Sequence, residues 1–307
     1  MSRRTNDPQA LLVGPTQFML GYQPQRQWSW LIATAFFFGK VGAGTFLISL
    51  LVGFKLGMLV GILVVAVLKT TAHLLFLGRP ERFLRALWGW KTSWISRGIH
   101  AMGIFIVFGL LRLAPSAFSF PHGAAKACGI VAAVAAVFVM FYDGFVMKAS
   151  RGIPLWDSYL TPLLVLAYAF LGGTTLTLAL EVAAGRTIQH GFEWFQVGLI
   201  LLNLGLLAVL VLSARVRGAA ADLAASLLVR GALGRLFLAV AIGVGIGATL
   251  VLVGVAIATG NHAILVAAAV SDLVGEFFVF FSILRAGVHP PVRPVAFLRR
   301  AAAVAGT

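Results

Sequence analysis

Eight apolar runs, separated by short segments that carry most of the charged residues, account for most of this 307-residue sequence. A run of about 20 apolar residues is what a helix needs to cross the ~30 Å hydrocarbon core of a bilayer. With 60% hydrophobic and only 11% charged residues, a soluble fold of this length would lack the polar side chains to cover its surface. We therefore predict an all-α integral membrane protein, a bundle of about eight transmembrane helices forming one domain over residues 1–307. The predicted spans are 28–53, 57–77, 99–114, 125–147, 159–180, 194–213, 236–259 and 263–284.

The lysines and arginines outside the spans predict the orientation of the bundle. An even number of spans places residues 1–27 and the tail 285–307 on one face, together with the loops 78–98, 148–158 and 214–235. That face holds eighteen of the basic residues and the opposite face four, Lys55, Arg112, Lys126 and Arg186. Because basic loops remain in the cytoplasm, both termini are predicted to be cytoplasmic, in the cytoplasmic (inner) membrane of a bacterium.

Composition also narrows the class of protein. The single cysteine, Cys128, excludes an internal disulfide and any iron–sulfur cluster held by this chain alone, because such clusters take about four thiolates. The net charge of +15 is better explained by the orientation bias and an acidic partner than by nucleic acid. The first residues show no apolar run followed by a small-residue cleavage site, so the first span is expected to direct insertion. No Walker A, His-Glu-x-x-His or nucleophile-elbow sequence is present.

Several ionisable side chains fall inside the predicted spans, where they are costly and therefore mark functional sites. One reading is structural: Lys40 and Lys69 pair with Asp143, Asp272 or Glu276 and hold the bundle together. The other is a cavity that binds a lipid-soluble quinone, whose carbonyls need hydrogen-bond donors and whose reduction needs protons. In that reading the quinone-binding residues are Tyr142, His73, Lys40, Lys69 and Arg79, and the proton relay consists of Asp143, Asp272 and Glu276.

Two other classes stay open at this stage. A haem would need histidines at similar depth on facing helices, and only His73 and His100 qualify. A transporter would use the buried charges to bind a substrate or ion, and inverted repeats or broken helices would favour it; neither is clear in the sequence.

The loop 78–98 interleaves basic and aromatic residues at a membrane boundary. Its tryptophans are typical of an aromatic belt. The combination also suits a surface that binds a partner protein or anionic headgroups. The predicted docking residues are Arg79, Arg82, Arg85, Trp94 and Arg97.

Two segments carry a family resemblance. The first runs from His73 through Phe76-Leu77-Gly78-Arg79-Pro80-Glu81-Arg82-Phe83 to Thr92-Ser93-Trp94-Ile95-Ser96-Arg97-Gly98. The second joins Tyr142-Asp143-Gly144 to Gly152-Ile153-Pro154-Leu155-Trp156-Asp157-Ser158 and Thr161-Pro162-Leu163-Leu164. With the small-residue run Gly39 to Thr45, these segments cover about a quarter of the chain. They resemble, in order, the polysulfide reductase/NrfD family and its DMSO reductase anchor-subunit relatives.

The resemblance implies an eight-helix quinone-binding anchor without haem or an iron–sulfur cluster of its own. Relatives lie beneath a four-cluster iron–sulfur subunit carrying [4Fe-4S] clusters, which connects to a molybdopterin-containing catalytic subunit. Tyr142 then matches the family's quinone-contacting tyrosine, and Arg79 and Arg82 match its basic loop facing the iron–sulfur subunit. The first-span histidine of some relatives is absent, and Ala35 lies near its place. In the DMSO reductase branch, a histidine and an acid stand where this chain has Phe76 and Gly98.

The predicted orientation places the partner subunits in the cytoplasm, which resembles the cytoplasmic sulfite-oxidising (SoeC-like) branch. The function expected from that likeness is transfer of electrons from sulfite oxidation to ubiquinone or menaquinone. The chain would be the quinone-reactive subunit, with molybdenum and iron–sulfur chemistry in its partners. A quinol-oxidising anchor of a polysulfide-, thiosulfate- or DMSO-type reductase is the alternative.

Overall fold

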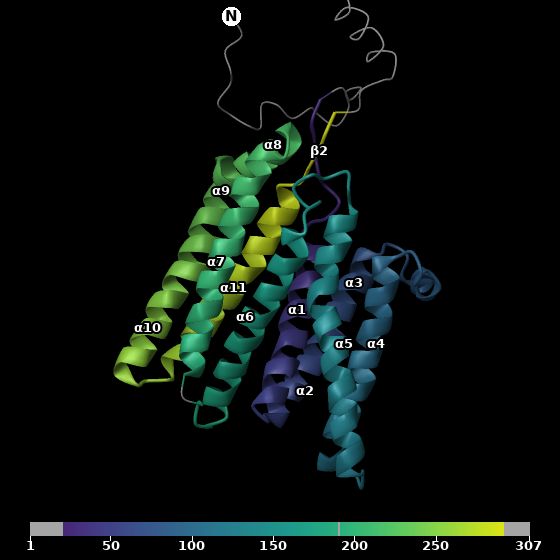
Figure 1. Cartoon of the computed structure of the whole chain (residues 1–307), viewed down its shortest axis with the longest axis vertical. Coiled ribbons are helices and arrows are strands. Elements are labelled where there is room, and N and C mark those ends of the chain that lie inside the picture. Colours follow the sequence, from purple (N-terminus) through teal and green to yellow (C-terminus); the bar gives the residue numbers. More distant parts are fainter. Residues whose placement is uncertain (1–20, 190, 292–307) are drawn as a thin grey trace, which may run out of the picture.

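The computed structural model describes residues 21–189 and 191–291, and these residues form a bundle of roughly parallel and antiparallel helices (Figure 1). Within this part of the chain, eight helical stretches are long and apolar enough to cross a membrane, which confirms the predicted all-α membrane fold. They are Trp30–Leu51, Lys55–Phe76, Trp94–Ser116, His122–Ala149, Leu160–Ala183, Phe192–Val216, Gly231–Thr259 and Ile264–Arg285.

Three of the eight spans consist of more than one helical segment, as the element bounds show. The second and seventh spans change from α to π geometry, at η2 and η5, and the third ends in a short 3₁₀ turn, η4. The elements of the first half are β1 (Gln23–Pro24), α1 (Trp30–Leu51), α2 (Lys55–Leu63), η2 (Val64–Lys69), α3 (Thr70–Phe76), the 3₁₀ helix η3 (Pro80–Leu87), α4 (Trp94–Leu113), η4 (Ala114–Ser116) and α5 (His122–Ala149). Those of the second half are α6 (Leu160–Ala183), α7 (Phe192–Val216), α8 (Ala219–Val229), α9 (Gly231–Leu236), η5 (Phe237–Ala248), α10 (Thr249–Thr259), α11 (Ile264–Arg285) and β2 (Val288–His289).

The two described ends of the chain meet at one end of the bundle. β1 pairs with β2 in antiparallel register, with Gln23 opposite His289, and the Trp156 indole donates to the carbonyl of Ile283 beneath them. This end also carries η3 and α8, and we call it the loop face (Figure 1). The other end, formed by residues 52–54, 117–121, 184–189, 191 and 260–263, is called the opposite face. Of the basic residues counted for orientation, Arg3, Arg4, Arg293, Arg299 and Arg300 lie outside the described residues.

Large parts of the two expected loops 78–98 and 214–235 are helical, and those predictions were wrong. The third span begins at Trp94 rather than at 99, because the Ser93 hydroxyl accepts a hydrogen bond from the Ser96 backbone N–H and caps the helix. The segment 214–235 contains α8, whose alanine and leucine side chains are buried except that of Ala219. An alanine-rich helix that packs at the membrane boundary carries no span-length signal, so hydropathy alone overlooked it.

The core of the bundle depends on helices that approach closely at glycines. A Cβ atom at Gly44 of α1 would overlap the backbone oxygen of Ala169 on α6, and one at Gly173 would overlap Gly44 in return. Such contacts between small residues are the usual source of helix affinity in membranes, where burial of apolar surface drives little association.

Gly44→Ala is expected to lower the thermal unfolding midpoint of the purified protein in mild detergent, because the added methyl group forces α1 from α6. Overpacking of this kind costs about 1–3 kcal/mol. Gly103→Ala is the matched control: a Cβ at Gly103 meets nothing within 4 Å. An equal effect of the two variants on the midpoint would contradict the proposed packing role.

Candidate functional site

A pocket of about 250 Å³ lies at the loop face, and four elements line it. α3 and η3 form one side, α4 forms the other, and Tyr142 of α5 closes it from within the bundle. Its walls combine apolar side chains with hydrogen-bonding ones, as small-molecule sites do. The lining residues are Thr70, His73, Leu77, Arg79, Arg82, Phe83, Ala86, Ile95, Ile99, Met102 and Tyr142. Three of the five residues predicted to bind quinone are therefore brought together here.

The orientation of the His73 ring follows from its backbone contact. Its Nδ1 lies 3.2 Å from the carbonyl oxygen of Lys69. A carbonyl only accepts, so Nδ1 carries a hydrogen, and the neutral ring has a free lone pair on Nε2. Neutral His73 is thus a proton acceptor, and protonated His73 is a donor through Nε2. His73 lies in α3, directly after the π-helical segment η2. Short π-helical segments of this kind are common at functional sites.

Tyr142 reaches the pocket because α4 has no side chain at position 98. A Cβ at Gly98 would overlap the Tyr142 ring. The tyrosine is almost fully buried yet lines the pocket. Gly98 stands in the segment that carried the family resemblance, and its role of making room for Tyr142 was not predicted.

Arg79, directly before η3, and Arg82, within it, line the pocket while remaining exposed at the loop face. Within η3 no residue is buried. The same two arginines thus border the pocket on one side and water on the other.

Behind the pocket lies the first of two buried ion pairs. Lys69 Nζ donates to Asp143 Oδ2 at 3.0 Å and to the Ala35 carbonyl at 3.2 Å, with neither Lys69 nor Asp143 exposed. The ammonium lies 4.9 Å from the centre of the Tyr142 ring, close enough for a cation–π contact. A Cβ at Gly39 would overlap Lys69 Nζ, so this glycine leaves the space that the lysine fills.

The second ion pair lies on the other side of α1 and does not line the pocket. Lys40 Nζ donates to Glu276 Oε2 at 2.9 Å, and both side chains are fully buried. One turn before Glu276, Asp272 accepts from the Thr175 hydroxyl at 2.6 Å and forms no ion pair among the described residues. The predicted pairing of the two lysines with buried carboxylates is confirmed, but it separates Lys40 from the other predicted quinone-binding residues.

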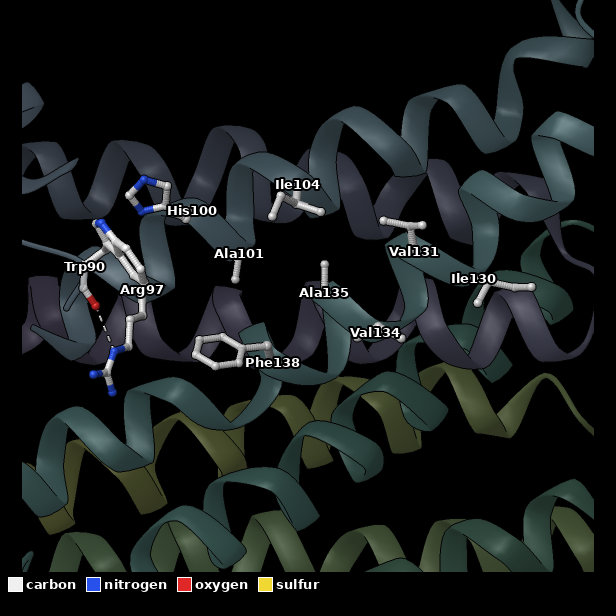
Figure 2. A pocket seen from close by; sticks show the side chains of 10 residues that line it. All are labelled: Trp90, Arg97, His100, Ala101, Ile104, Ile130, Val131, Val134, Ala135 and Phe138. Atoms are coloured by element: carbon white, nitrogen blue, oxygen red, sulfur yellow. Dashed lines mark hydrogen bonds between the residues drawn. The ribbon is translucent and has the colours of Figure 1, made fainter. Parts of the chain in front are cut away.

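A second hollow runs between α4 and α5, on the face of α4 that the pocket does not use (Figure 2). It is wide and open, about 810 Å³, and its walls are almost wholly apolar. Only the end near Trp90, Arg97 and His100 is polar. The remaining lining residues are Ala101, Ile104, Ile130, Val131, Val134, Ala135 and Phe138. His100 therefore belongs to this groove and His73 to the pocket, so α4 separates the two histidines that were considered for haem.

The predicted docking residues divide into two groups. Arg79, directly before η3, is exposed, as are Arg82 and Arg85 on η3. Trp94 instead packs inward and stacks on Phe145, with ring centres 4.5 Å apart. Arg97 stacks on Trp94 and donates to the carbonyls of Trp90 and Lys91, at 2.9 and 2.7 Å, which fixes the turn before α4.

The fold and the pocket define a multi-pass membrane protein with a small-molecule site at one membrane boundary. The family model described as "Polysulphide reductase, NrfD" matches residues 20–290, and the chain belongs to this family. It is the membrane subunit of a polysulfide reductase-like oxidoreductase complex. Members of the family interact with quinones and associate with iron–sulfur and molybdenum catalytic subunits. A search of curated proteins finds no match.

Lys69→Met is expected to destabilise the protein strongly, because it leaves Asp143 as a buried carboxylate without its cation. Removing one member of a buried pair costs about 3–5 kcal/mol, whereas replacing both with apolar residues is often neutral. The double variant Lys69→Met/Asp143→Leu should therefore unfold in detergent at a higher temperature than Lys69→Met alone. If both variants unfold at the same temperature, the pair does not stabilise the bundle.

Proposed function

We propose that this chain is the quinone-reactive subunit of its complex and that the quinone ring binds in the pocket between α3, η3, α4 and α5. The single observation that carries the proposal is the convergence of His73, Arg79 and Tyr142 on one pocket with apolar walls. Ile95, Ile99 and Met102 give the ring its apolar surroundings. Tyr142 and Arg79 supply O–H and N–H groups that hydrogen-bond a quinone carbonyl.

Quinone reduction takes up two electrons and two protons, and we propose that the pocket's own groups handle the protons. His73 Nε2 exchanges one proton directly with the ring oxygen, since its Nδ1 is engaged by the Lys69 carbonyl. The Lys69–Asp143 pair lies next to the Tyr142 ring and supplies a buried proton reservoir. Lys40 lies outside the pocket, so we assign it to the proton relay with Asp272 and Glu276 rather than to quinone binding.

Electrons are proposed to enter at the loop face, where an iron–sulfur subunit docks on η3. The exposed Arg79, Arg82 and Arg85 offer a basic surface directly over the pocket. Positive surfaces of this kind guide and orient an acidic partner. Partly buried Trp94 and locally bonded Arg97 support that surface rather than forming it.

The proposed electron donor is sulfite, oxidised at a cytoplasmic molybdopterin subunit in the inner membrane of a bacterium. Two findings support it: membership of the family, and the excess of basic residues on the loop face, which predicts that this face is cytoplasmic. The alternative is the reverse direction, a quinol-oxidising anchor of a polysulfide-, thiosulfate- or DMSO-type reductase.

Tyr142→Phe and His73→Gln are each expected to lower sulfite-dependent quinone reduction by the purified complex about tenfold, the equivalent of ~1.4 kcal/mol. Each removes one group that bonds or protonates the ring. Co-purifying iron and molybdenum should stay at the native level. Tyr159→Phe, at an exposed tyrosine outside the pocket, is the control. Unchanged turnover in both pocket variants would show that the quinone does not bind in this pocket. Activity with formate or quinol, but not with sulfite, would show that sulfite is not the electron donor.

Reversing the charges on and directly before η3, with Arg79→Glu, Arg82→Glu and Arg85→Glu combined, is expected to release the iron–sulfur subunit. A pull-down of the tagged chain in mild detergent should recover at least tenfold less iron. Recovery by the native protein should itself fall as salt is raised, because exposed charges are screened. Lys126→Glu on the opposite face is the matched control. Full recovery of iron with the triple variant would place the docking surface elsewhere.

A further inference from the structure

A second line of polar side chains lies on the side of α1 away from the pocket and connects four helices. The Gln196 amide of α7 donates to Thr175 Oγ1 of α6 at 2.8 Å. Thr175 in turn donates to Asp272 Oδ2 of α11 at 2.6 Å. Asp272 and Glu276 are one helical turn apart on the same helix, and Glu276 holds Lys40 of α1 at 2.9 Å. The four helices thus share one chain of polar contacts in the bundle interior.

This line begins near water at the opposite face. His262, in the connection between α10 and α11, lies with Nδ1 3.2 Å from Glu193 Oε1, and the histidine side chain is 46% exposed. Glu193 is in the first turn of α7, three residues before Gln196, so the two share a helical face. In Figure 1 the connections at the lower ends of α6, α7, α10 and α11 lie together at this face. Arg186 forms a separate pair with Glu181 there.

Burial makes a purely structural role for this line expensive. Thr175, Gln196, Asp272, Glu276 and Lys40 are all at most 2% exposed. Gln196 Oε1, Glu276 Oε1 and the hydroxyl of the neighbouring Tyr168 have no hydrogen-bond partner within the described part of the chain. Lys40 lies 5.2 Å from the Tyr168 ring. Buried polar atoms of this kind are normally satisfied, often by internal water, so a line of them has the chemistry of a proton path.

The inner end of the line reaches the level of the proposed quinone site. Lys40 follows Gly39 directly in α1. The Lys69 side chain packs against Gly39, and its ammonium donates to Asp143. The two ion pairs therefore flank α1 at adjacent residues, one facing the polar line and one facing the pocket.

We propose that His262, Glu193, Gln196, Thr175, Asp272 and Glu276 conduct protons between water at the opposite face and Lys40, for exchange with the quinone pocket. This inference rests on the proposed function. Reduction of one quinone consumes two electrons from the partner at the loop face and two protons, yielding one quinol. Because protons and electrons use different faces, turnover moves charge across the membrane.

The test uses the whole complex reconstituted in vesicles, with the pH of each compartment set separately. In the native complex, quinone turnover should respond to the pH of the compartment at the opposite face, and a voltage-sensitive dye should report charge movement. Asp272→Asn and Gln196→Leu should each lower turnover at saturating quinone about tenfold without changing the KM for quinone. A small permeant weak acid such as hydrazoic acid should restore part of the rate in Asp272→Asn, which a folding defect would not allow.

Thr177→Val is the matched control, because Thr177 lies on the same helix as Thr175 but contacts the Gly173 carbonyl and the Ser49 hydroxyl of α1 instead of the polar line. It should retain the native rate and the native charge movement. The proposal is overturned if the native complex ignores the pH at the opposite face, or if the two path variants turn over and charge the membrane normally. If instead Tyr142→Phe also leaves turnover unchanged, the quinone site itself is misplaced and the proposed function fails.

Discussion

Two lysine–carboxylate pairs, buried on either side of α1, constrain how this bundle packs. An isolated charge inside the hydrocarbon region is costly, so Lys40 and Lys69 must each meet a carboxylate on another helix. Lys40 connects α1 to α11 through Glu276, and Lys69 connects the second span to α5 through Asp143. These contacts fix the rotation of four helices about their axes. With the helices in this rotation, the pocket lies on one side of α1 and the line of polar side chains from Gln196 to Lys40 lies on the other.

Glycines provide the space in which these buried polar side chains pack. Gly39 leaves room for the Lys69 ammonium, and Gly98 leaves room for the Tyr142 ring. In each case a Cβ atom would displace the functional side chain rather than merely separate two helices. Small residues in this protein therefore position polar groups as well as bringing backbones together, and the two roles coincide because the polar groups are themselves buried between helices.

The pocket lies where the proposed chemistry needs it, beneath the basic helix η3 and beside the first buried ion pair. Electron transfer requires a partner close to the ring, and proton transfer requires ionisable groups in contact with it. The apolar groove between α4 and α5 is larger, but its walls supply almost no hydrogen-bonding groups. Polar chemistry rather than volume therefore selects the pocket as the site.

The sequence by itself determined the membrane fold, the eight spans and most of the buried ionisable residues, because hydropathy and charge are local properties that survive without tertiary contacts. It also identified His73, Arg79 and Tyr142, which the structure brings to one pocket. It missed Glu181 and Glu193, which lie near span ends and are buried only by tertiary packing. Only the tertiary structure decided which carboxylate each lysine pairs with and that Lys40 lies outside the pocket. It also decided that Thr175 and Gln196 form a hydrogen-bonded chain with Asp272. Those outcomes depend on how each helix is rotated against its neighbours, and that rotation is set by contacts between residues far apart in the chain.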